Sequence, residues 1–279
     1  LAVNAMFTLS DAQTEITAYG STKSTSSWYV GKTYGEIWGY RASGIIQTQE
    51  EADEYNAKYN LSYLTGKAWE PGDVKYIDLN GDNKIDRGDN NLKNMGDLTI
   101  IGNTTPRYQY TFNGSISYKD LSLSMMFQGV AKRDWDPGTA PYFWGSGAYA
   151  QVTVFNEHMD YWREDNKDAY YPKPYIHSAG GVGPFRNKTM QTSDRYLQSG
   201  AYCRLKNITL SYNLPSTWVQ KAGLQKVQVF FSGENLLTFT SLKGMFDPEA
   251  IFTSNSYTGE GGKNYPMNKV VSFGLVVNL

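Results

Sequence analysis

The chain has 279 residues, a formal net charge of −1 and a charged fraction of 19%. This near-neutral balance gives no reason to expect nucleic-acid binding. The mean hydropathy is −0.51 and no apolar run reaches about 18 residues, so a transmembrane helix is excluded. A transmembrane β-barrel is not excluded, because alternating strands average to a polar hydropathy. The single cysteine, Cys203, excludes an internal disulfide framework.

The N-terminal segment alternates apolar and polar residues, which predicts a strand near residues 1–18. A chain that begins inside a strand, without an initiator methionine or a leader-type sequence, is expected to be a fragment of a longer protein. Residues 29–47 set glycines among aromatic and β-branched residues, which indicates bent strands outside a membrane. Thr48 and the acidic residues after it predict a helix over about 48–58.

The acidic segment from Asp78 to Asp89 has the oxygen spacing of an EF-hand calcium loop. The candidate ligands are Asp78, Asn80, Asp82, the backbone carbonyl of Lys84, Asp86 and Asp89. Calcium takes six or more oxygen ligands, and a curled loop with acidic groups at every second residue can supply them. Two features depart from the pattern, since Asn83 replaces the usual glycine and Asp89 is shorter than the usual glutamate. The alternative is a polar turn whose side chains cap their own backbone.

The most regular pattern in the chain covers residues 107–118 and 121–131. In both segments apolar or aromatic residues alternate with Ser, Thr, Asn and Gln, and Lys119-Asp120 separates them, which predicts a β-hairpin. The polar face carries almost no charge, whereas a soluble sandwich normally presents Lys and Glu to bulk water. Apolar stripes with aromatic ends and uncharged polar faces are typical of an outer-membrane barrel.

A long excursion to about residue 200 follows, and the same alternation then predicts strands near 201–214, 226–240 and 269–279. A bulge is expected between Leu205 and Ile208, because the apolar parity changes there. The connections alternate in length, and the long ones cover 19–106, 132–200 and 241–268. Because outer-membrane barrels have short periplasmic turns and long extracellular loops, the pattern predicts about six membrane strands within residues 1–279.

Aromatic residues are frequent in the predicted loops. The set comprises Trp28, Tyr34, Trp38, Trp135, Tyr142, Trp144, Tyr149, Tyr161 and Trp162. These side chains could stack on sugar rings or on a partner protein, or they could pack the loops against one another. His158 and His177 have no metal-ligand spacing around them. Neither a nucleophile with a positioned base nor a phosphate-binding loop is present, so no enzymatic activity is predicted.

Several separate motifs resemble the C-terminal part of the SusC/RagA family of TonB-dependent outer-membrane transporters. They are DVKYIDLNGDNKID, IGNTTPRYQYTFNGSISYKDLSLSMMFQG, RLKNITLSYNLP, VFFSGENLLTFT and SFGLVVNL, and they occur in the family's order. The resemblance implies an all-β fold, in which the chain is the C-terminal portion of a plugged transmembrane antiparallel β-barrel of about 22 strands with long extracellular loops. The signal peptide, the TonB-contacting region and the plug would lie upstream.

The family resemblance also implies a function and a set of partners. The expected function is TonB-energised uptake of oligosaccharides or peptides across the bacterial outer membrane, with a SusD-like lipoprotein capping the extracellular mouth. The other expected partners are the remainder of the barrel and plug, TonB through the missing N-terminal region, and outer-membrane lipid. Residues 133–200 and 241–268 are expected to contribute to the surface that the lipoprotein covers.

The runner-up hypothesis is a soluble calcium-binding β-domain that binds carbohydrate. Exposure of the apolar strand positions separates the two hypotheses. A barrel leaves Tyr108, Phe112, Leu123 and Phe231 facing out of the protein, whereas a sandwich buries them in a shared core. In a barrel, the uncharged residues Gln109, Asn113, Ser124 and Gln128 look inward. The strands at 1–10 and 270–279 are then expected to pair with polypeptide outside this sequence, because six strands are too few to close.

Overall fold

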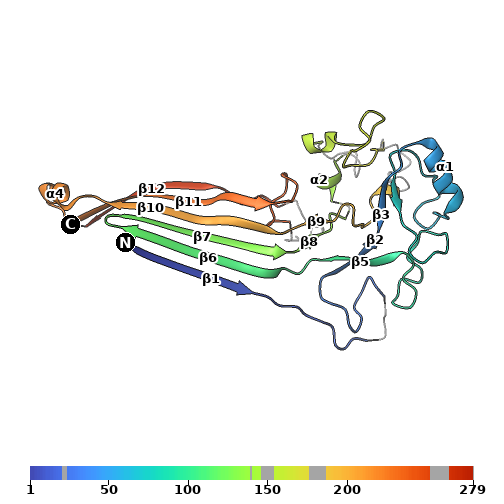
Figure 1. Cartoon of the computed structure of the whole chain (residues 1–279), viewed down its shortest axis with the longest axis horizontal. Coiled ribbons are helices and arrows are strands. Elements are labelled where there is room, and N and C mark those ends of the chain that lie inside the picture. Colours follow the sequence, from blue (N-terminus) through green and yellow to red (C-terminus); the bar gives the residue numbers. More distant parts are fainter. Residues whose placement is uncertain (21–23, 139, 146–153, 176–186, 252–263, 279) are drawn as a thin grey trace.

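One antiparallel sheet of six strands forms the long part of the molecule (Figure 1). The computed structural model describes residues 1–20, 24–138, 140–145, 154–175, 187–251 and 264–278. The strand order is β1-β6-β7-β10-β11-β12, so each strand pairs with the sheet strand that follows it along the chain. The strands are β1 (Ala2–Ser10), β6 (Arg107–Tyr118), β7 (Leu121–Lys132), β10 (Tyr202–Asn213), β11 (Lys226–Thr240) and β12 (Val270–Asn278).

The register sorts the side chains of this sheet into a polar face and an apolar face. One polar row crosses all six strands: Asn4, Ser115, Ser124, Thr209, Ser232 and Ser272. The adjacent row on the opposite face is Val3, Ile116, Leu123, Leu210, Phe231 and Phe273. Hydroxyl groups bond across the polar face, as in the 3.2 Å contact between Thr209 and Ser232. The period-two alternation of the sequence therefore produces two chemically distinct faces.

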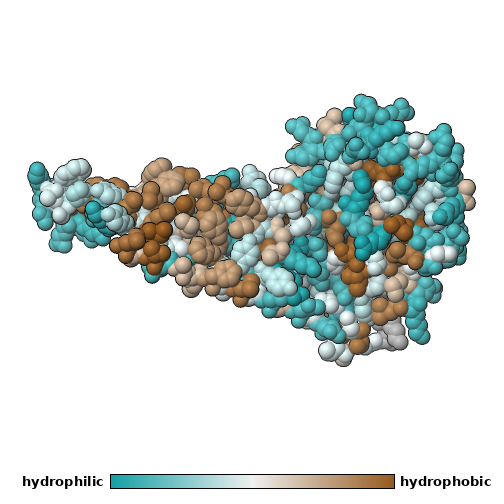
Figure 2. Space-filling view, viewed as in Figure 1, coloured by the Kyte–Doolittle hydropathy of each residue, from teal (hydrophilic) through white to brown (hydrophobic). Residues whose placement is uncertain are grey.

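The sheet is a single layer. In the part of the chain that the structure describes, the hydrophobic core cluster contains no residue of the six strands. Tyr108 is 44% exposed, and Phe112, Leu123 and Phe231 are only half-buried. Among the described residues no second sheet covers the apolar face, so the two-layered sandwich arrangement is wrong. In Figure 2 the visible surface over the strands is mostly apolar, and the surface at the other end is mostly polar.

The sheet is open, since β1 and β12 each pair with one strand and not with each other. β1 ends at Ser10 and does not continue to residue 18. The next residue, Asp11, accepts hydrogen bonds from the guanidinium of Arg107 at 2.5 and 2.6 Å, and the chain then leaves the sheet. The expected bulge is confirmed, because the register of β10 shifts between Leu205 and Asn207 against both neighbouring strands. Such a shift keeps the apolar side chains on one face despite the change of parity.

The long connections gather at one end of the sheet, and the short connections and both chain ends lie at the other (Figure 1). The described parts of the long connections contain three small sheets: β2 (Glu36–Tyr40) with β5 (Leu98–Asn103), β3 (Ala42–Ile45) with β4 (Val74–Tyr76), and β8 (Asp134–Trp135) with β9 (Gln198–Ser199). The helices whose bounds lie within the described residues include α1 (Gln49–Lys58), α2 (Pro141–Trp144), η2 (Asn156–Met159), α4 (Ser216–Val219) and η3 (Gln220–Ala222). Thr48 caps α1 as expected, accepting the Glu51 N–H at 3.2 Å. Among the described helices, none has the length and apolar character needed to cross a membrane.

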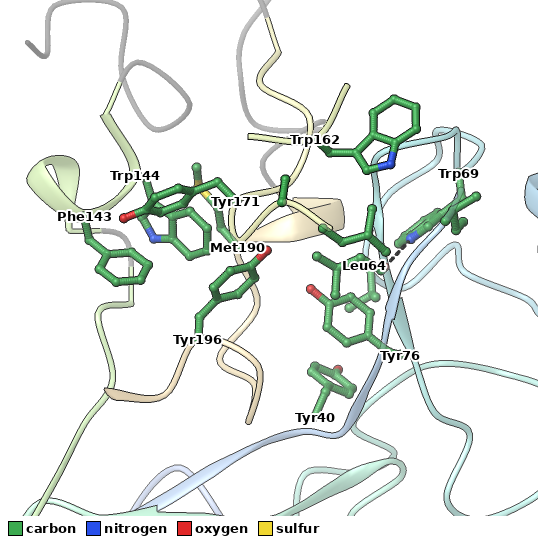
Figure 3. Packing of buried hydrophobic residues seen from close by; sticks show 14 of the residues in the cluster. Tyr40, Leu64, Trp69, Tyr76, Phe143, Trp144, Trp162, Tyr171, Met190 and Tyr196 are labelled. Atoms are coloured by element: carbon green, nitrogen blue, oxygen red, sulfur yellow. Dashed lines mark hydrogen bonds between the residues drawn. The ribbon is translucent and has the colours of Figure 1, made fainter. Parts of the chain in front are cut away.

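The long connections share one hydrophobic core, called here the loop core. Its large members include Tyr40, Leu64, Trp69, Tyr76, Phe143, Trp144, Trp162, Tyr171, Met190 and Tyr196 (Figure 3). Aromatic rings meet edge to face, as in the pair Trp144 and Tyr196, whose centroids are 4.7 Å apart. Trp69 donates its indole N–H to the Val74 carbonyl at 2.9 Å, the dashed line of Figure 3. The described parts of the long connections thus form one packed layer around this core, called here the loop layer, and are not separate solvated connections.

Candidate functional site

The polar face of the sheet is the first candidate surface. Gln109, Asn113, Ser124 and Gln128 all lie on it, since the register aligns Asn113 with Met126, Ser115 with Ser124 and Thr111 with Gln128. A cavity of about 440 Å³ opens on this face, and amide and hydroxyl side chains of four strands line it. Groups of this kind donate and accept hydrogen bonds without carrying charge. The face can therefore contact a polar polypeptide or a hydrated solute.

An ion-pair cluster joins the N-terminal part of β10 to the connection between β11 and β12. Arg204 is 2% exposed, and its guanidinium lies 2.8 Å from Asp247 and 3.2 Å from Glu249. Lys206 lies 2.7 Å from the other oxygen of Glu249. The neighbouring Phe246 packs in the loop core, 4.9 Å from the Trp135 ring. One short segment therefore fastens the loop core to the sheet.

The carboxylate of Asp247 makes this attachment dependent on pH. Burial alone would raise its pKa, but the N–H groups of Glu249 and Met267 and the Arg204 guanidinium together hold the pKa below its usual value. An acid with a lowered folded pKa stabilises the protein above its unfolded pKa of about 3.9 and loses that contribution as the pH falls through the folded value. Asp247→Asn is expected to destabilise the segment by about 1.5–3 kcal/mol at pH 7.

Hydrogen exchange of residues 242–251 in the whole protein measures this effect. Exchange should accelerate in Asp247→Asn at pH 7, and in the unmodified protein only at strongly acidic pH. Glu54→Gln removes an exposed carboxylate elsewhere and should change neither rate. Equal protection of residues 242–251 in Asp247→Asn and the unmodified protein would show that the carboxylate does not hold this segment.

A second buried ion pair lies inside the loop layer. Lys188 and Asp73 have fully buried side chains, and their charged groups are 3.0 Å apart. Asp73 also accepts the hydroxyl of Tyr175 at 2.5 Å and the backbone N–H of Glu70 at 2.8 Å. Burial raises the pKa of Asp73 even though Lys188 opposes the rise. This pair could not be predicted from the sequence, because its members are 115 positions apart.

The acidic segment from Asp78 to Asp89 forms a loop that is stabilised by hydrogen bonds from backbone N–H groups to side chains. Asp78 accepts the N–H groups of Gly81 and Asn83 at 2.7 and 2.9 Å, and Asp82 accepts the N–H of Lys84 at 2.9 Å. Asn83 has the left-handed φ of 59° that its position requires, and Ile85 is fully buried. These are the contacts of a self-capping turn.

The remaining candidate ligands lie around the same loop. Asn80 accepts the Asp82 N–H at 3.0 Å, Asp86 accepts the Gly88 N–H at 2.6 Å, and Asp89 accepts the Asn94 side-chain amide at 3.1 Å. Within the described ranges, no three His, Cys, Asp or Glu side chains are grouped so that they could hold a metal ion. Calcium binding therefore stays a prediction.

Asp97 organises the acidic loop and was not singled out from the sequence. It is fully buried, and its carboxylate accepts the backbone N–H groups of Leu79 at 2.7 Å and Asp86 at 2.9 Å. Burial raises its pKa against these hydrogen bonds. A single side chain thus draws the two sides of the loop together. Its only sequence signal is an acidic residue directly before the apolar strand β5, which is too common a pattern to be diagnostic.

The described members of the predicted aromatic set fall into three groups: buried, exposed and half-buried. Trp135, Trp144 and Trp162 are buried in the loop core, so they pack the loops against one another. Trp28, Tyr34 and Tyr142 are 37%, 52% and 40% exposed, and Trp28 stacks on Tyr34 with centroids 5.4 Å apart. Trp38 and Tyr161 are half-buried, whereas Tyr149 and His177 lie outside the described residues.

An open antiparallel sheet with one apolar face and one polar face that carries few charges, and with a packed layer of long loops at one end, is a segment of an outer-membrane-type β-barrel wall. No family model matches the chain. The chain is 30% identical over 251 residues to TonB-dependent receptor P3 of Formosa agariphila and 25% identical over 254 residues to TonB-dependent receptor P26 of the same organism. These matches cover 88% and 89% of the chain but only 22% and 23% of the receptors.

Solved structures agree with this fold. The RagAB peptide importer in its closed-closed state matches with a TM-score of 0.62 and 21% identity, over 99% of this chain and 27% of that one. Its open-open state matches with a TM-score of 0.61 over 99% of this chain and 26% of that one. The chain is thus homologous to one segment of the TonB-dependent receptors, and its resemblance to the SusC/RagA family is confirmed. These relatives are receptors and transporters and not enzymes, as expected.

Proposed function

We propose that this chain forms part of the barrel wall of a TonB-dependent outer-membrane importer of oligosaccharides or peptides. The observation that carries the proposal is the single-layered sheet, whose apolar face no other described element covers and whose opposite face is polar, with few charged residues. Homology to TonB-dependent receptors along 88% of the chain supports it. In this arrangement the apolar face contacts outer-membrane lipid, and the polar face looks into a lumen that holds the plug.

The two sheet edges belong to the same proposal. β1 and β12 expose unpaired backbone groups along Ala2–Ser10 and Val270–Asn278. Bare edges of this length favour aggregation, and no backbone group can stay unpaired in lipid. Both edges therefore pair with further barrel strands of the longer protein. Contact with TonB is made by a region outside this sequence.

The packed loop layer supports a capping partner. A SusD-like lipoprotein would cover the extracellular end, where exposed aromatic side chains such as Trp28, Tyr34 and Tyr142 lie on polar loops. Large exposed apolar groups are common at protein interfaces. Under this proposal the described parts of 19–106, 133–200 and 241–268 are extracellular, and the latter two contribute to the partner surface.

The experiment that tests this function uses the full-length protein with its own lipoprotein. The protein should fractionate with the outer membrane, copurify with the lipoprotein and import peptides or oligosaccharides only when TonB is present. A protein that leaves the membrane in alkaline carbonate, as a peripheral protein does, would refute the proposal. So would a barrel that stays alone and imports nothing.

We also propose that the Asp78–Asp89 loop binds one calcium ion through Asp78, Asn80, Asp82, the Lys84 carbonyl, Asp86 and Asp89. Oxygen spacing along the loop supports this, together with the left-handed Asn83 and the buried Ile85. Terbium luminescence of the purified protein should rise on titration and fall when calcium competes. The double variant Asp82→Asn/Asp86→Asn should weaken binding at least tenfold, whereas Asp53→Asn in α1 should not. Luminescence that is unchanged in the double variant would favour the plain turn.

A further inference from the structure

The loop layer contains a small cavity whose walls are aromatic rings, prolines and methionines. Its volume is about 260 Å³, and residues of η2, the segment Tyr171–Tyr175 and the pair Thr189–Met190 surround it. Trp144, Tyr171 and Met190 lie together at one side of the loop core (Figure 3). The cavity opens beside Met159, which is 56% exposed, and Val154, which is 48% exposed. Aromatic and apolar side chains thus make up most of the lining, together with the polar residues His158, Lys173 and Thr189.

Most polar atoms of the lining side chains are already in use, although the buried hydroxyl of Tyr171 has no hydrogen-bond partner among the described residues. Trp144 donates its indole N–H to the Gly138 carbonyl at 2.8 Å. His158 accepts the Phe155 N–H at Nδ1, 3.1 Å away, and donates from Nε2 to the carbonyl of Tyr142 at 3.0 Å. These contacts leave the indole carbons and the imidazole ring faces, and not their nitrogens, to meet a ligand.

Two more lining side chains are fixed by hydrogen bonds to acidic residues that do not line the cavity. Tyr175 donates its hydroxyl to the buried carboxylate of Asp73, and Lys173 donates to Glu70 at 3.2 Å. Gly145 permits the close approach of His158, since it has a φ of 60° and a Cβ there would lie 2.6 Å from the imidazole Nδ1. The cavity is therefore preformed by the fold, which keeps the ordering cost of binding low.

We infer that this cavity receives one apolar side chain of a peptide cargo. The inference rests on the proposed import function and narrows its substrate class. Whole small-molecule sites span about 300–1,000 Å³, so 260 Å³ suits a single group with the rest of its ligand outside. An apolar cavity of about 150 Å³ already accepts benzene. One aromatic or branched aliphatic side chain therefore fits.

The chemistry of the walls argues against a sugar ring. A hexose carries a hydroxyl group on most of its ring carbons, and each one needs a hydrogen-bond partner when it is buried. Among the described lining residues there is no Asp, Asn, Glu, Gln or Arg. The polar groups of His158, Lys173 and Tyr175 already bond to other parts of the protein. The hydroxyls of Tyr171 and Thr189 remain in the lining, which are few partners for a ring that carries a hydroxyl on most of its carbons. A leucine or phenylalanine side chain makes no such demand and gains from leaving water.

The test measures which side chain the purified transporter–lipoprotein complex retains. The probes are the pentapeptides Ser-Gly-X-Gly-Ser with phenylalanine, leucine or serine at X, quantified by mass spectrometry after equilibration in detergent. Burial of one such side chain predicts that the phenylalanine and leucine peptides are retained at least about tenfold better than the serine peptide. Maltohexaose should not displace them.

Variants at the exposed mouth assign the preference to this cavity. Met159→Trp narrows the mouth of the cavity, and Met159→Glu places a carboxylate there. Each variant should retain the phenylalanine, leucine and serine peptides about equally. Neither change disturbs a buried contact, because Met159 is exposed. Leu92→Trp adds the same ring at another half-exposed apolar position and should leave the preference unchanged.

The outcomes separate this inference from the import function. Three outcomes would refute the side-chain pocket without refuting the import function. They are equal retention of the three peptides, a preference that persists in both Met159 variants, and displacement of the peptides by maltohexaose. Retention of neither peptides nor maltohexaose, together with no import of either, would overturn both.

Discussion

Met125→Arg is expected to destabilise the folded protein in a membrane by about 2–4 kcal/mol, the cost of a cation at the bilayer midplane of a barrel. Met125 pairs in register with Gly114, and the row continues through Ile208 on the apolar face. Gly114 lies between Tyr108 and Tyr118 on β6. Ten residues of tilted strand span roughly 25 Å across the membrane, the height of the apolar band in such barrels. Met125 therefore sits near the middle.

Two matched substitutions separate the effect of the sheet face from the effect of depth in the membrane. Ser124→Arg places the same cation on the polar face one residue away, and it should cost clearly less than Met125→Arg. Tyr118→Arg keeps the apolar face but moves to the membrane boundary, where the cost falls to about 0–1 kcal/mol. Urea unfolding of the full-length protein in lipid vesicles measures all three. Equal costs at positions 124 and 125 would mean that lipid does not cover the apolar face.

The strands were predictable because each one has two different faces. Alternation along residues 107–118 and 121–131 set both the strand positions and the register, since a slip of one residue would exchange every side chain between the faces. The change of parity around Leu205 located the bulge for the same reason. The end of β1 at Ser10 was not predictable, because it depends on a contact between Asp11 and the distant Arg107.

The loop layer could not be predicted in this way, because its stabilising contacts join distant segments. Trp144 and Tyr196 pack together, although neither belongs to a periodic pattern. The acidic spacing of residues 78–89 correctly indicated a turn. It did not indicate the role of Asp97, whose carboxylate accepts backbone N–H groups from both sides of that turn. The sequence showed that the loops are aromatic. Only the structure shows which rings are buried and which form a cavity.

Lys188→Met is expected to destabilise the loop layer by about 3–5 kcal/mol at neutral pH, because it leaves the carboxylate of Asp73 buried without a counter-charge. Lys188 is the charge that opposes the burial-driven rise of the pKa of Asp73, so the variant raises that pKa further. A folded pKa above the unfolded one means that the folded state binds more protons, so stability falls as the pH rises. The variant should therefore regain stability between pH 7 and pH 5.

The double variant Lys188→Met/Asp73→Asn tests the cause of this loss. The Glu70 N–H and the Tyr175 hydroxyl bond to different oxygens of Asp73. An asparagine carbonyl oxygen can still accept the Glu70 N–H, while its NH2 group can donate to the Tyr175 oxygen. Removing the charge should therefore restore part of the stability and abolish the pH dependence. Lys67→Met, at an exposed position of the same layer, should change stability by less than about 0.5 kcal/mol. Hydrogen exchange of β4 between pH 5 and pH 7 reads out each variant. A Lys188→Met protein that loses stability on acidification, or a double variant less stable than the single one, would show that the buried charge is not what destabilises the layer.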